Sequence, residues 1–574
     1  MIHDKIHQAL SALHKRPFAM AFALPLVLIL ILLAWYPARY ETNDDFFMNL
    51  IASGFYSGSP DEHLTYSHFL PGLVVSSLFK LYAGINWYFF YLLFFHWLGW
   101  SLILYAWFRN TSNTFVIPAL LVVMVLFETY FYLNFQFTTT SAILACGGMS
   151  LILTGDNWSR PLQRSNLLGL AAIVVASMIR YEPALLVSFL SAPLILLGTH
   201  WRKWPGTIIL LLMLPAGIFL SEKLNKSYYS LQPEWNTFFT ELKTGNKFND
   251  NPAFYQTIIN ERKNLQQING WSENDMLLFG VFFRNYAPVY NVEAYQRLYQ
   301  SYNQLRAKPF RDYFYLFRHD FGKLPVLLLA VLAFALGSTR TRWIILVQFI
   351  VLGLITYYIY SFLLMKERVI YGILLCLSVN YLYLISKAPA KPQLYKIRTS
   401  LIQQTGLVLL VIVAGLLLNT QVTKLFARHK AQAEQLQKDL PLLADKNACY
   451  VIYGGCIPFE GIPPIENRFT WQKREFTMFS LSAFHKSPLN KPNLARFNQS
   501  ALETAFADPR YKVITFADSA MIPLTPERLD RFSIAHLGCS LHLESDSFIA
   551  NSNKRLFWFK GCEPIQTDST STVR

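Results

Sequence analysis

Long runs of apolar residues recur along this chain of 574 residues, and they constrain its fold more than any other feature. A helix of about 20 apolar residues spans the hydrocarbon core of a bilayer. Hydrophobic residues make up 53% of the chain and charged residues only 15%, a balance that ordinary soluble domains do not show. We therefore predict a polytopic α-helical membrane protein with about eleven transmembrane helices, at 18–36, 86–108, 114–133, 137–154, 166–181, 184–199, 205–221, 323–337, 343–364, 369–386 and 402–420.

Basic residues near these runs indicate how the chain is oriented, because cytoplasmic loops carry an excess of Lys and Arg. The first run follows Lys15 and Arg16 and lacks a small-residue cleavage pattern, which favours an uncleaved anchor with a cytoplasmic N-terminus over a signal peptide. The predicted spans then place the basic loops in the cytoplasm and the C-terminus outside the plasma (inner) membrane. The basic residues of these loops are Arg109, Arg160, Arg164, Arg202, Lys203, Arg340, Arg342 and those between Lys387 and Arg398.

The formal net charge of +16 raises the question of nucleic-acid binding. Because many of the basic residues lie in the short loops, membrane orientation accounts for the excess. We expect no nucleic-acid partner, and the lipid bilayer is the partner that composition predicts.

The segment 65–82 is apolar enough to be a further span, but a crossing there would turn every later basic loop outward. Four residues at successive i, i+4 positions give a helix one weakly polar face; they are His68, Gly72, Ser76 and Lys80. We interpret this segment as a juxtamembrane helix at the outer surface, with a crossing helix as the alternative.

Three large segments then lie outside the membrane: the loops 37–85 and 222–322 and the C-terminal region 421–574. We divide the chain into a transmembrane domain, 1–420, and an extracytoplasmic domain, 421–574. Short β-like runs in the second domain alternate with Pro-rich turns and predict a small α/β or α+β fold; they are 449–453, 511–516 and 555–559. In the loop 222–322, Ser272 followed by Asp275 predicts the start of a helix.

The six cysteines divide between the two predicted domains. Four of them, Cys449, Cys456, Cys539 and Cys562, lie in the C-terminal region, where an even number suits two disulfides in an oxidising compartment. The sequence does not specify how they pair. The other two lie in apolar runs, where we expect packing residues.

Two adjacent carboxylates, Asp44 and Asp45, follow the first span by a few residues. A carboxylate that is partly desolvated and crowded by a like charge has a raised pKa and can take a proton from a hydroxyl, so either residue is a candidate general base. The alternative is a structural role, with Asn43 or Asp44 capping the next helix and the acids complementing its dipole. With Glu62 and His63 the two acids would also suit Mg²⁺ or Mn²⁺, although their spacing is not specific for a metal.

Arg180 and Glu182 lie at membrane depth inside the apolar stretch 166–199. One helix through this stretch would be about 50 Å long, so the chain should turn near Pro183, on the outer side. Charged residues at this depth usually face a cavity or a partner. Arg180 could hold a phosphate through its planar guanidinium while Glu182 orients it or contacts a sugar hydroxyl; pairing of the two residues, or contact of Arg180 with lipid headgroups, is the alternative.

A second pair of cations, Lys366 and Arg368, lies on the outer side between the spans 343–364 and 369–386. Cations at the start of a helix oppose its dipole, and cations outside break the charge bias of the loops. A phosphate or pyrophosphate of a lipid carrier would account for both; anionic lipid headgroups are the alternative.

Three further polar residues are candidates for substrate contact. Glu128 lies near the outer end of its span and could line the same cavity or have a hydrogen-bonded structural role. His63 and His68 lie in the first outer loop; a lone histidine near a membrane surface usually does not contact substrate.

Taken together, these features resemble the GT-C superfamily of integral-membrane glycosyltransferases, which take sugars from polyprenyl-phosphate or polyprenyl-pyrophosphate carriers. The similarity rests on a first span with its N-terminus inside, the acidic motif Asn43-Asp44-Asp45 in a long outer loop, juxtamembrane helices, basic residues at outer helix ends and a C-terminal extracytoplasmic domain. The stretch 66–71, Tyr-Ser-His-Phe-Leu-Pro, is also similar to the His-Pro-Pro-Leu motif of protein mannosyltransferases and aminoarabinose transferases, but it lacks the paired prolines.

The resemblance implies an inverting transfer of a hexosyl or pentosyl group from a polyprenyl-linked donor to a glycan, lipid or protein acceptor of the cell envelope. It implies Asp44, or else Asp45, as the base that activates the acceptor, and Arg180, Lys366 and Arg368 as the groups that stabilise the leaving phosphate. A flippase or transporter of lipid-linked saccharides, a polymerase or ligase that uses the same carriers, and a non-catalytic envelope scaffold are the alternatives.

Overall fold

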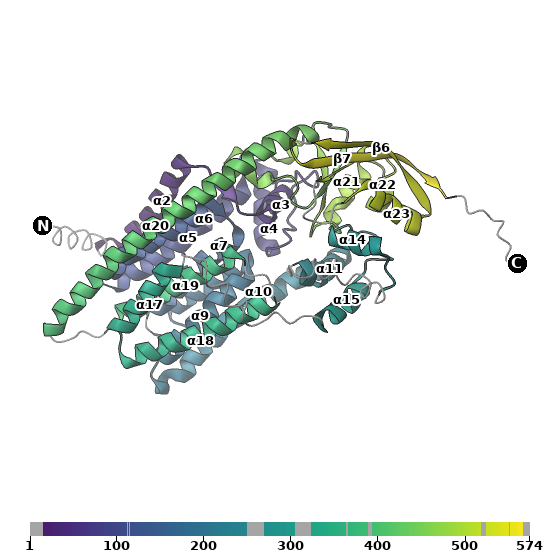
Figure 1. Ribbon diagram of the computed structural model, residues 1–574. Coiled ribbons are helices and arrows are strands. Elements are labelled where there is room, and N and C mark those ends of the chain that lie inside the picture. Colours follow the sequence, from purple (N-terminus) through teal and green to yellow (C-terminus); the bar gives the residue numbers. More distant parts are fainter. Residues whose placement is uncertain are drawn as a thin grey trace.

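The computed structural model describes residues 15–111, 113, 115–155, 157–249, 269–304, 323–362, 366–388, 393–517, 524–549 and 551–565. Most of these residues form helices, and a small mixed sheet lies toward the C-terminal end (Figure 1). Within the described ranges, nine helices are long and apolar enough to cross a membrane. They include α2 (Pro17–Trp35), α5 (Trp87–Asn110), α6 (Val116–Leu133), α7 (Phe137–Gly155), α9 (Tyr181–Gly198), α10 (Trp204–Ser230), α18 (Thr339–Phe362), α19 (Glu367–Ser386) and α20 (Gln393–Asp439).

Three shorter apolar helices accompany them: α4 (Phe69–Leu81), α8 (Arg164–Ile179) and α17 (Leu324–Leu336). Helices α8 and α17 coincide with two of the predicted spans, and the nine longer helices coincide with the other nine. Helix α4 has both ends on the side of the sheet domain, since His68 N donates to Met178 O at the end of α8 and Ala83 O accepts from the Asn467 side chain of that domain. It therefore does not cross the bundle, as we predicted for the segment 65–82.

Helix α7 lies at the centre of the bundle, and its apolar window is 100% buried. Glycines allow its neighbours to approach closely, as is common between membrane helices. A Cβ atom on Gly147 would lie 2.8 Å from Gly99 O of α5, and one on Gly148 would lie 2.5 Å from Gly169 O of α8. Larger side chains at these positions would separate the helices.

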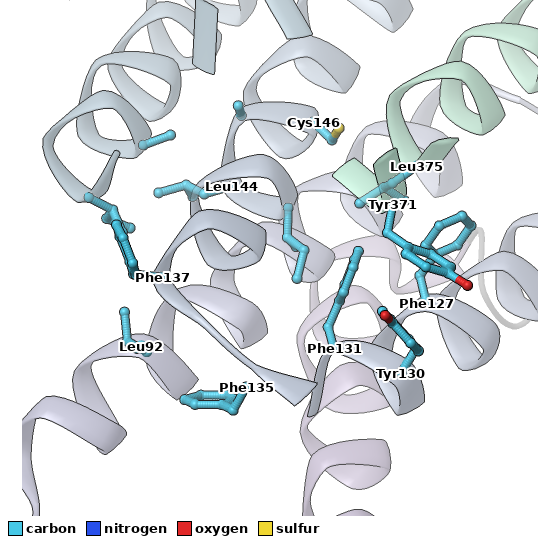
Figure 2. Close-up of a cluster of buried hydrophobic side chains, with 14 of the residues drawn as sticks. Leu92, Phe127, Tyr130, Phe131, Phe135, Phe137, Leu144, Cys146, Tyr371 and Leu375 are labelled. Carbon is cyan, nitrogen blue, oxygen red and sulfur yellow. The ribbon is translucent and has the colours of Figure 1, made fainter. Parts of the chain in front are cut away.

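An aromatic cluster fixes α19 against α6 (Figure 2). The rings of Tyr130 and Tyr371 stack with centroids 4.0 Å apart, and Phe127 contacts the same Tyr371 ring edge-on. The Tyr130 hydroxyl also donates to Glu367 Oε2 at 3.2 Å. These contacts determine where the N-terminal end of α19, with its cations, lies in the bundle.

The C-terminal sheet has five strands in the order β4-β3-β5-β7-β6. Strands β3 (Cys449–Tyr453), β4 (Thr477–Leu481) and β5 (Tyr511–Phe516) run parallel, while β6 (Cys539–Ile549) and β7 (Lys554–Pro564) form an antiparallel hairpin that pairs with β5. Helix α23 (Pro526–Leu537) packs on β6. The predicted runs 449–453 and 511–516 are β3 and β5, and 555–559 lies within β7, which confirms a small mixed domain.

One disulfide, Cys539–Cys562, joins β6 to β7, while Cys449 and Cys456 are buried free thiols. The expectation of two disulfides was therefore wrong. Cys449 packs in the core on the side of the second-loop helices, whereas Cys456 packs in the core that continues into the bundle, and its thiol lies 3.5 Å from Ile514 O. Both residues serve as small apolar core residues, as do Cys146 and Cys376 in the helices.

Much of the loop predicted at 222–322 packs against the sheet domain. Helix α10 extends to Ser230, and α11 (Pro233–Asn249), α14 (Glu273–Gly280) and α15 (Val292–Gln304) follow it; residues 250–268 and 305–322 lie outside the described residues. Trp271 and Phe279 belong to the same buried cluster as Val451 of β3. The predicted helix start is confirmed, because Ser272 and Asp275 form a capping box at α14.

Helix α20 runs from the bundle to the sheet domain (Figure 1). Its 47 residues measure about 70 Å at 1.5 Å per residue, which is more than twice the thickness of a hydrocarbon core. Its last residue, Asp439, is fully buried and lies 3.8 Å from Lys554 Nζ of β7. The domain boundary placed at residue 420 thus falls inside one continuous helix.

The cysteine pattern gives a direct test of the domain. We expect four of the six cysteines to react with maleimide after denaturation without reductant, and all six after reduction. Replacing Cys539 and Cys562 together by Ser should lower the free energy of unfolding of the domain by about 3 kcal/mol, because the bridge closes a loop between residues separated by 23 positions. Pulse proteolysis in urea measures this loss. Two labelled thiols in the unreduced protein would contradict the single bridge.

Candidate functional site

A cavity of about 540 Å³ lies between α7, α9, α18 and α19, a size typical of ligand-binding sites. Its walls are mostly apolar and come from Ala142, Pro183, Leu185, Leu186, Val187, Phe189, Leu190, Leu354, Ile355, Tyr358, Ile359, Val369, Gly372 and Ile373. Three of these side chains are exposed on the outside of the bundle: Phe189 by 50%, Leu354 by 65% and Tyr358 by 60%. The cavity is therefore open sideways, between α9 and α18, toward the surface that would face lipid.

One end of the cavity is polar, and its charged residues are Arg180, Glu182, Lys366 and Arg368. The helical path breaks at Arg180, whose backbone is extended (φ −157°, ψ 125°) between the end of α8 and the start of α9. The predicted turn near Pro183 therefore occurs three residues earlier, and Pro183 becomes the third residue of α9, where a proline is tolerated. The break lets α8 and α9 pack side by side with Arg180 at their junction.

The Arg180 guanidinium is held from two directions. Its Nε atom lies 3.0 Å from Glu182 Oε2, so the ion pair considered as an alternative is present. Its planar group lies 4.9 Å from the centre of the Phe137 ring and 5.8 Å from that of Tyr66. These contacts orient the arginine before any ligand arrives.

Arg368 lies in the first turn of α19 and is only 7% exposed. Its Nη2 atom lies 3.5 Å from Asp44 Oδ2, and its Nη1 atom lies 3.6 Å from Glu41 Oε2. Two carboxylates of the first loop thus offset a cation that the helix dipole disfavours. Lys366 occupies the N-cap position of α19 with extended backbone and lines the same end of the cavity.

The two adjacent aspartates have different environments because consecutive helical residues point about 100° apart. Both lie in the first turn of α3 (Asn43–Ala52), whose N-cap is Thr42, and no side chain caps this helix. The Asp44 side chain is 27% exposed and faces Arg368, whereas Asp45 is fully buried. Asp45 Oδ1 accepts hydrogen bonds from Tyr88 Oη and Phe137 N, each at 3.0 Å.

Burial raises the pKa of Asp45 well above its usual value, and the neighbouring charge of Asp44 adds to this effect. The two hydrogen bonds from Tyr88 and Phe137 act in the opposite direction. A carboxyl group in this setting favours the protonated form. The geometry therefore separates a partly exposed acid, Asp44, from a buried acid that connects α3 to α5 and α7.

The other three sequence candidates are not among the residues that line this cavity. Glu128 is 1% exposed and accepts a hydrogen bond from Trp100 Nε1 at 2.7 Å, with His96 Nδ1 at 3.1 Å, which is the structural role considered as an alternative. His68 caps α4 through Leu70 N and bonds to Ser221 O at 3.1 Å. His63 lies between Asp61 and Gln232.

The metal ligands suggested by the sequence do not form one group. Among the described residues, the set of His, Cys, Asp and Glu side chains arranged closely enough for a metal ion is Asp61, Glu62 and His63. Asp44 faces Arg368 and Asp45 is enclosed by Tyr88 and the start of α7. The separation arises because α3 carries these two acids away from the loop that follows it.

Sequence reasoning missed two parts of the site. Glu41 belongs to the acidic first loop, but only the fold shows that it shares Arg368 with Asp44. The second part is the apolar wall that α18 contributes to the cavity. No sequence pattern marks it, because apolar residues that line a cavity look the same in sequence as apolar residues that face lipid.

Comparisons of this chain with models of protein families, with curated proteins and with solved structures found no match. Inference about function therefore depends on the geometry of the site.

The buried aspartate predicts a stability effect that Asp44 should not share. Asp45→Ala leaves the Phe137 amide without an acceptor and the Tyr88 hydroxyl with only the weak acceptor Met48 Sδ, and a buried group that loses its partner costs about 1–3 kcal/mol. Asp45→Asn keeps an acceptor oxygen and should be milder. Thermal unfolding in detergent measures the difference, with Asp44→Asn as the matched control; equal loss in Asp44→Asn and Asp45→Ala would contradict the assignment.

The same residue predicts a pH dependence. Because the pKa of Asp45 is raised in the folded state, the folded protein holds this proton at pH values above the usual 3.8, where the unfolded chain has lost it. Its contribution to stability is therefore complete below pH 3.8 and is lost as the pH rises through the raised pKa. Asp45→Asn should flatten this part of the stability curve, and an unchanged slope would contradict the prediction.

Proposed function

We propose that this chain is a membrane glycosyltransferase that transfers a sugar from a polyprenyl-phosphate or polyprenyl-pyrophosphate carrier to an acceptor hydroxyl. The observation that carries the proposal is the contact of Asp44, at 3.5 Å, with Arg368, which lines the cationic end of an apolar cavity that opens sideways between α9 and α18. A carrier of this kind has an apolar tail and an anionic head, and the cavity offers a matching surface for each.

The cations are the groups that would bind the carrier phosphate. Arg180, Lys366 and Arg368 line one end of the cavity and come from two separate junctions of the bundle. Arginine binds phosphate through two parallel hydrogen bonds, and lysine acts as a point charge. Carboxylates already orient both arginines, so a phosphate would join an existing network of charges.

The proposed reaction is a displacement at the anomeric carbon of the donor sugar. Asp44 takes the proton from the acceptor hydroxyl as the acceptor oxygen forms a bond to that carbon. The bond between this carbon and the phosphate oxygen breaks, and the carrier leaves with the electron pair. The cations stabilise the charge that develops on the leaving phosphate, and the anomeric configuration inverts.

The proposal includes eleven membrane spans, made of the nine longer helices together with α8 and α17, with the N-terminus in the cytoplasm and the sheet domain outside. The Cys539–Cys562 bridge supports an oxidising location for the domain. The first loop, the second loop and the domain then lie on one side, above the polar end of the cavity. An acceptor of the cell envelope would reach Asp44 from that side.

Asp44→Asn tests the catalytic role most directly. In proteoliposomes that contain a synthetic polyprenyl-phosphate sugar, we expect this variant to transfer sugar about 10²- to 10⁴-fold more slowly, because a positioned base contributes that much. Binding of the donor, followed with a photoreactive carrier, should change little. Asp445→Asn is the matched control, since this acid lies on the sheet domain and pairs with Lys512.

Substitution of the cations that would bind the donor phosphate completes the test. Arg180→Gln and Lys366→Gln should weaken donor capture, while Arg180→Lys should recover part of it because the charge remains. Full sugar transfer by a folded Asp44→Asn protein would exclude Asp44 as the base. Transport of intact donor across the vesicle without any transfer would favour a flippase.

The proposed orientation has its own test. A reporter active only in the cytoplasm, fused after residue 574, should be inactive, whereas the same reporter fused before residue 1 should be active. The basic loops between the apolar helices supply the physical reason. Activity of the C-terminal fusion would require an even number of spans and would contradict the proposed topology.

A further inference from the structure

Three candidate metal ligands lie side by side in the segment that joins α3 to α4, outside the cavity. One ligand atom from each of Asp61, Glu62 and His63 lies within 4.8 Å of the others. Two carboxylate oxygens and one imidazole nitrogen form a donor set that suits Zn²⁺ or Mn²⁺. His63 is 6% exposed, so its position is determined by packing.

The contacts of His63 leave room for a cation beside His63 and the acids, coordinated by both. Its Nδ1 atom lies 2.6 Å from Asp61 Oδ1, and its Nε2 atom lies 3.1 Å from Gln232 Oε1, so both ring nitrogens face acceptor oxygens. A neutral imidazole has only one N–H group. If Nε2 donates to Gln232, the lone pair of Nδ1 faces the carboxylate, and a metal ion satisfies both. A ligating histidine typically donates its other ring N–H in this way.

A buried hydroxyl beside the cluster supplies an independent observation. Tyr229 is 5% exposed, and its hydroxyl has no hydrogen-bond partner among the described residues. Its ring lies 5.5 Å from that of His63, and the charges of Asp61 and Glu62 act on its hydroxyl. Buried tyrosine hydroxyls are normally paired. A bound ion with its water ligands would give this group the partner it lacks.

Neighbouring helices hold the ligands in place. The Tyr228 hydroxyl of α10 donates to Glu62 Oε1 at 3.1 Å, and the His63 ring stacks on Trp235 of α11 with centroids 4.2 Å apart. We propose that Asp61, Glu62 and His63 bind one divalent cation, of the Zn²⁺ or Mn²⁺ type. The ion would fix the side chains of Glu62 and His63 where they contact Tyr228, Gln232 and Trp235, and would so order the first loop against the junction of α10 and α11.

Metal binding by the full-length protein in detergent tests the proposal without any substrate. The protein is stripped with a chelator and titrated with Mn²⁺, followed by electron paramagnetic resonance, and with Zn²⁺, followed by elemental analysis. We expect a single bound ion per chain. Asp61→Asn and Glu62→Gln retain the shapes of the side chains, and His63→Asn removes the imidazole; each should weaken binding by about 10-fold or more.

A matched control and a second readout distinguish this site from others. His542→Ala removes a histidine that pairs with Glu563 on the hairpin of the sheet domain, and it should bind the ion as the wild type does. In the wild type, the ion should slow hydrogen exchange in residues 53–68 and 228–237, and this protection should be lost in Glu62→Gln.

Two results would overturn the proposal. Wild-type protein that retains no ion after titration would mean that His63 is held by its hydrogen bonds to Asp61 and Gln232 alone. Binding that is unchanged in all three ligand variants would mean that the ion lies elsewhere. Because neither measurement involves sugar transfer, this proposal and the proposed function can fail separately.

Discussion

The buried carboxyl group of Asp45 makes the contacts on which the arrangement of the polar site depends. Helix α7 is enclosed by its neighbours, and glycine contacts fix how closely α5 and α8 approach it. The buried backbone amide of its first residue, Phe137, and the hydroxyl of Tyr88 on α5 both donate hydrogen bonds to Asp45. These two hydrogen bonds fix the position of α3 relative to α5 and α7. The next acid along the same helical turn, Asp44, therefore lies beside Arg368.

The membrane part of the fold could be predicted from sequence because a bilayer imposes a strong local requirement. Each span must satisfy its own backbone and present apolar side chains, so every predicted run coincides with a helix. The same locality explains why β3 and β5 and the Ser272 capping box were found. The packing of the second loop on the sheet domain could not be found, since Trp271 and Val451 are far apart in the chain. The pairing of the cysteines depends on the same long-range packing.

Sequence identified the site residues whose charge is energetically costly beside apolar helices, and it identified the others less well. Arg180, Lys366 and Arg368 were identified because a cation near apolar helices needs a partner, and the structure brings all three to one cavity. Glu128 satisfied the same criterion, but His96 and Trp100 provide its partners inside the bundle. For Asp44 and Asp45, helical geometry requires that their side chains diverge. Which of them is buried depends on Tyr88 and Phe137, which sequence spacing does not reveal.

The shape and charge of the cavity together restrict what it can bind. A soluble anion would gain from the cations but nothing from the apolar walls that α9, α18 and α19 provide. A neutral lipid would fill the walls and leave three cations at one end without a counterpart beyond the protein's own acids. The donor that we propose, with an apolar tail and a phosphate head, would use both ends, and the sideways opening at Phe189, Leu354 and Tyr358 would let it enter from the side of the bundle. Because Asp44 contacts Arg368, one contact would position both the base and one of the phosphate-binding cations of the proposed reaction.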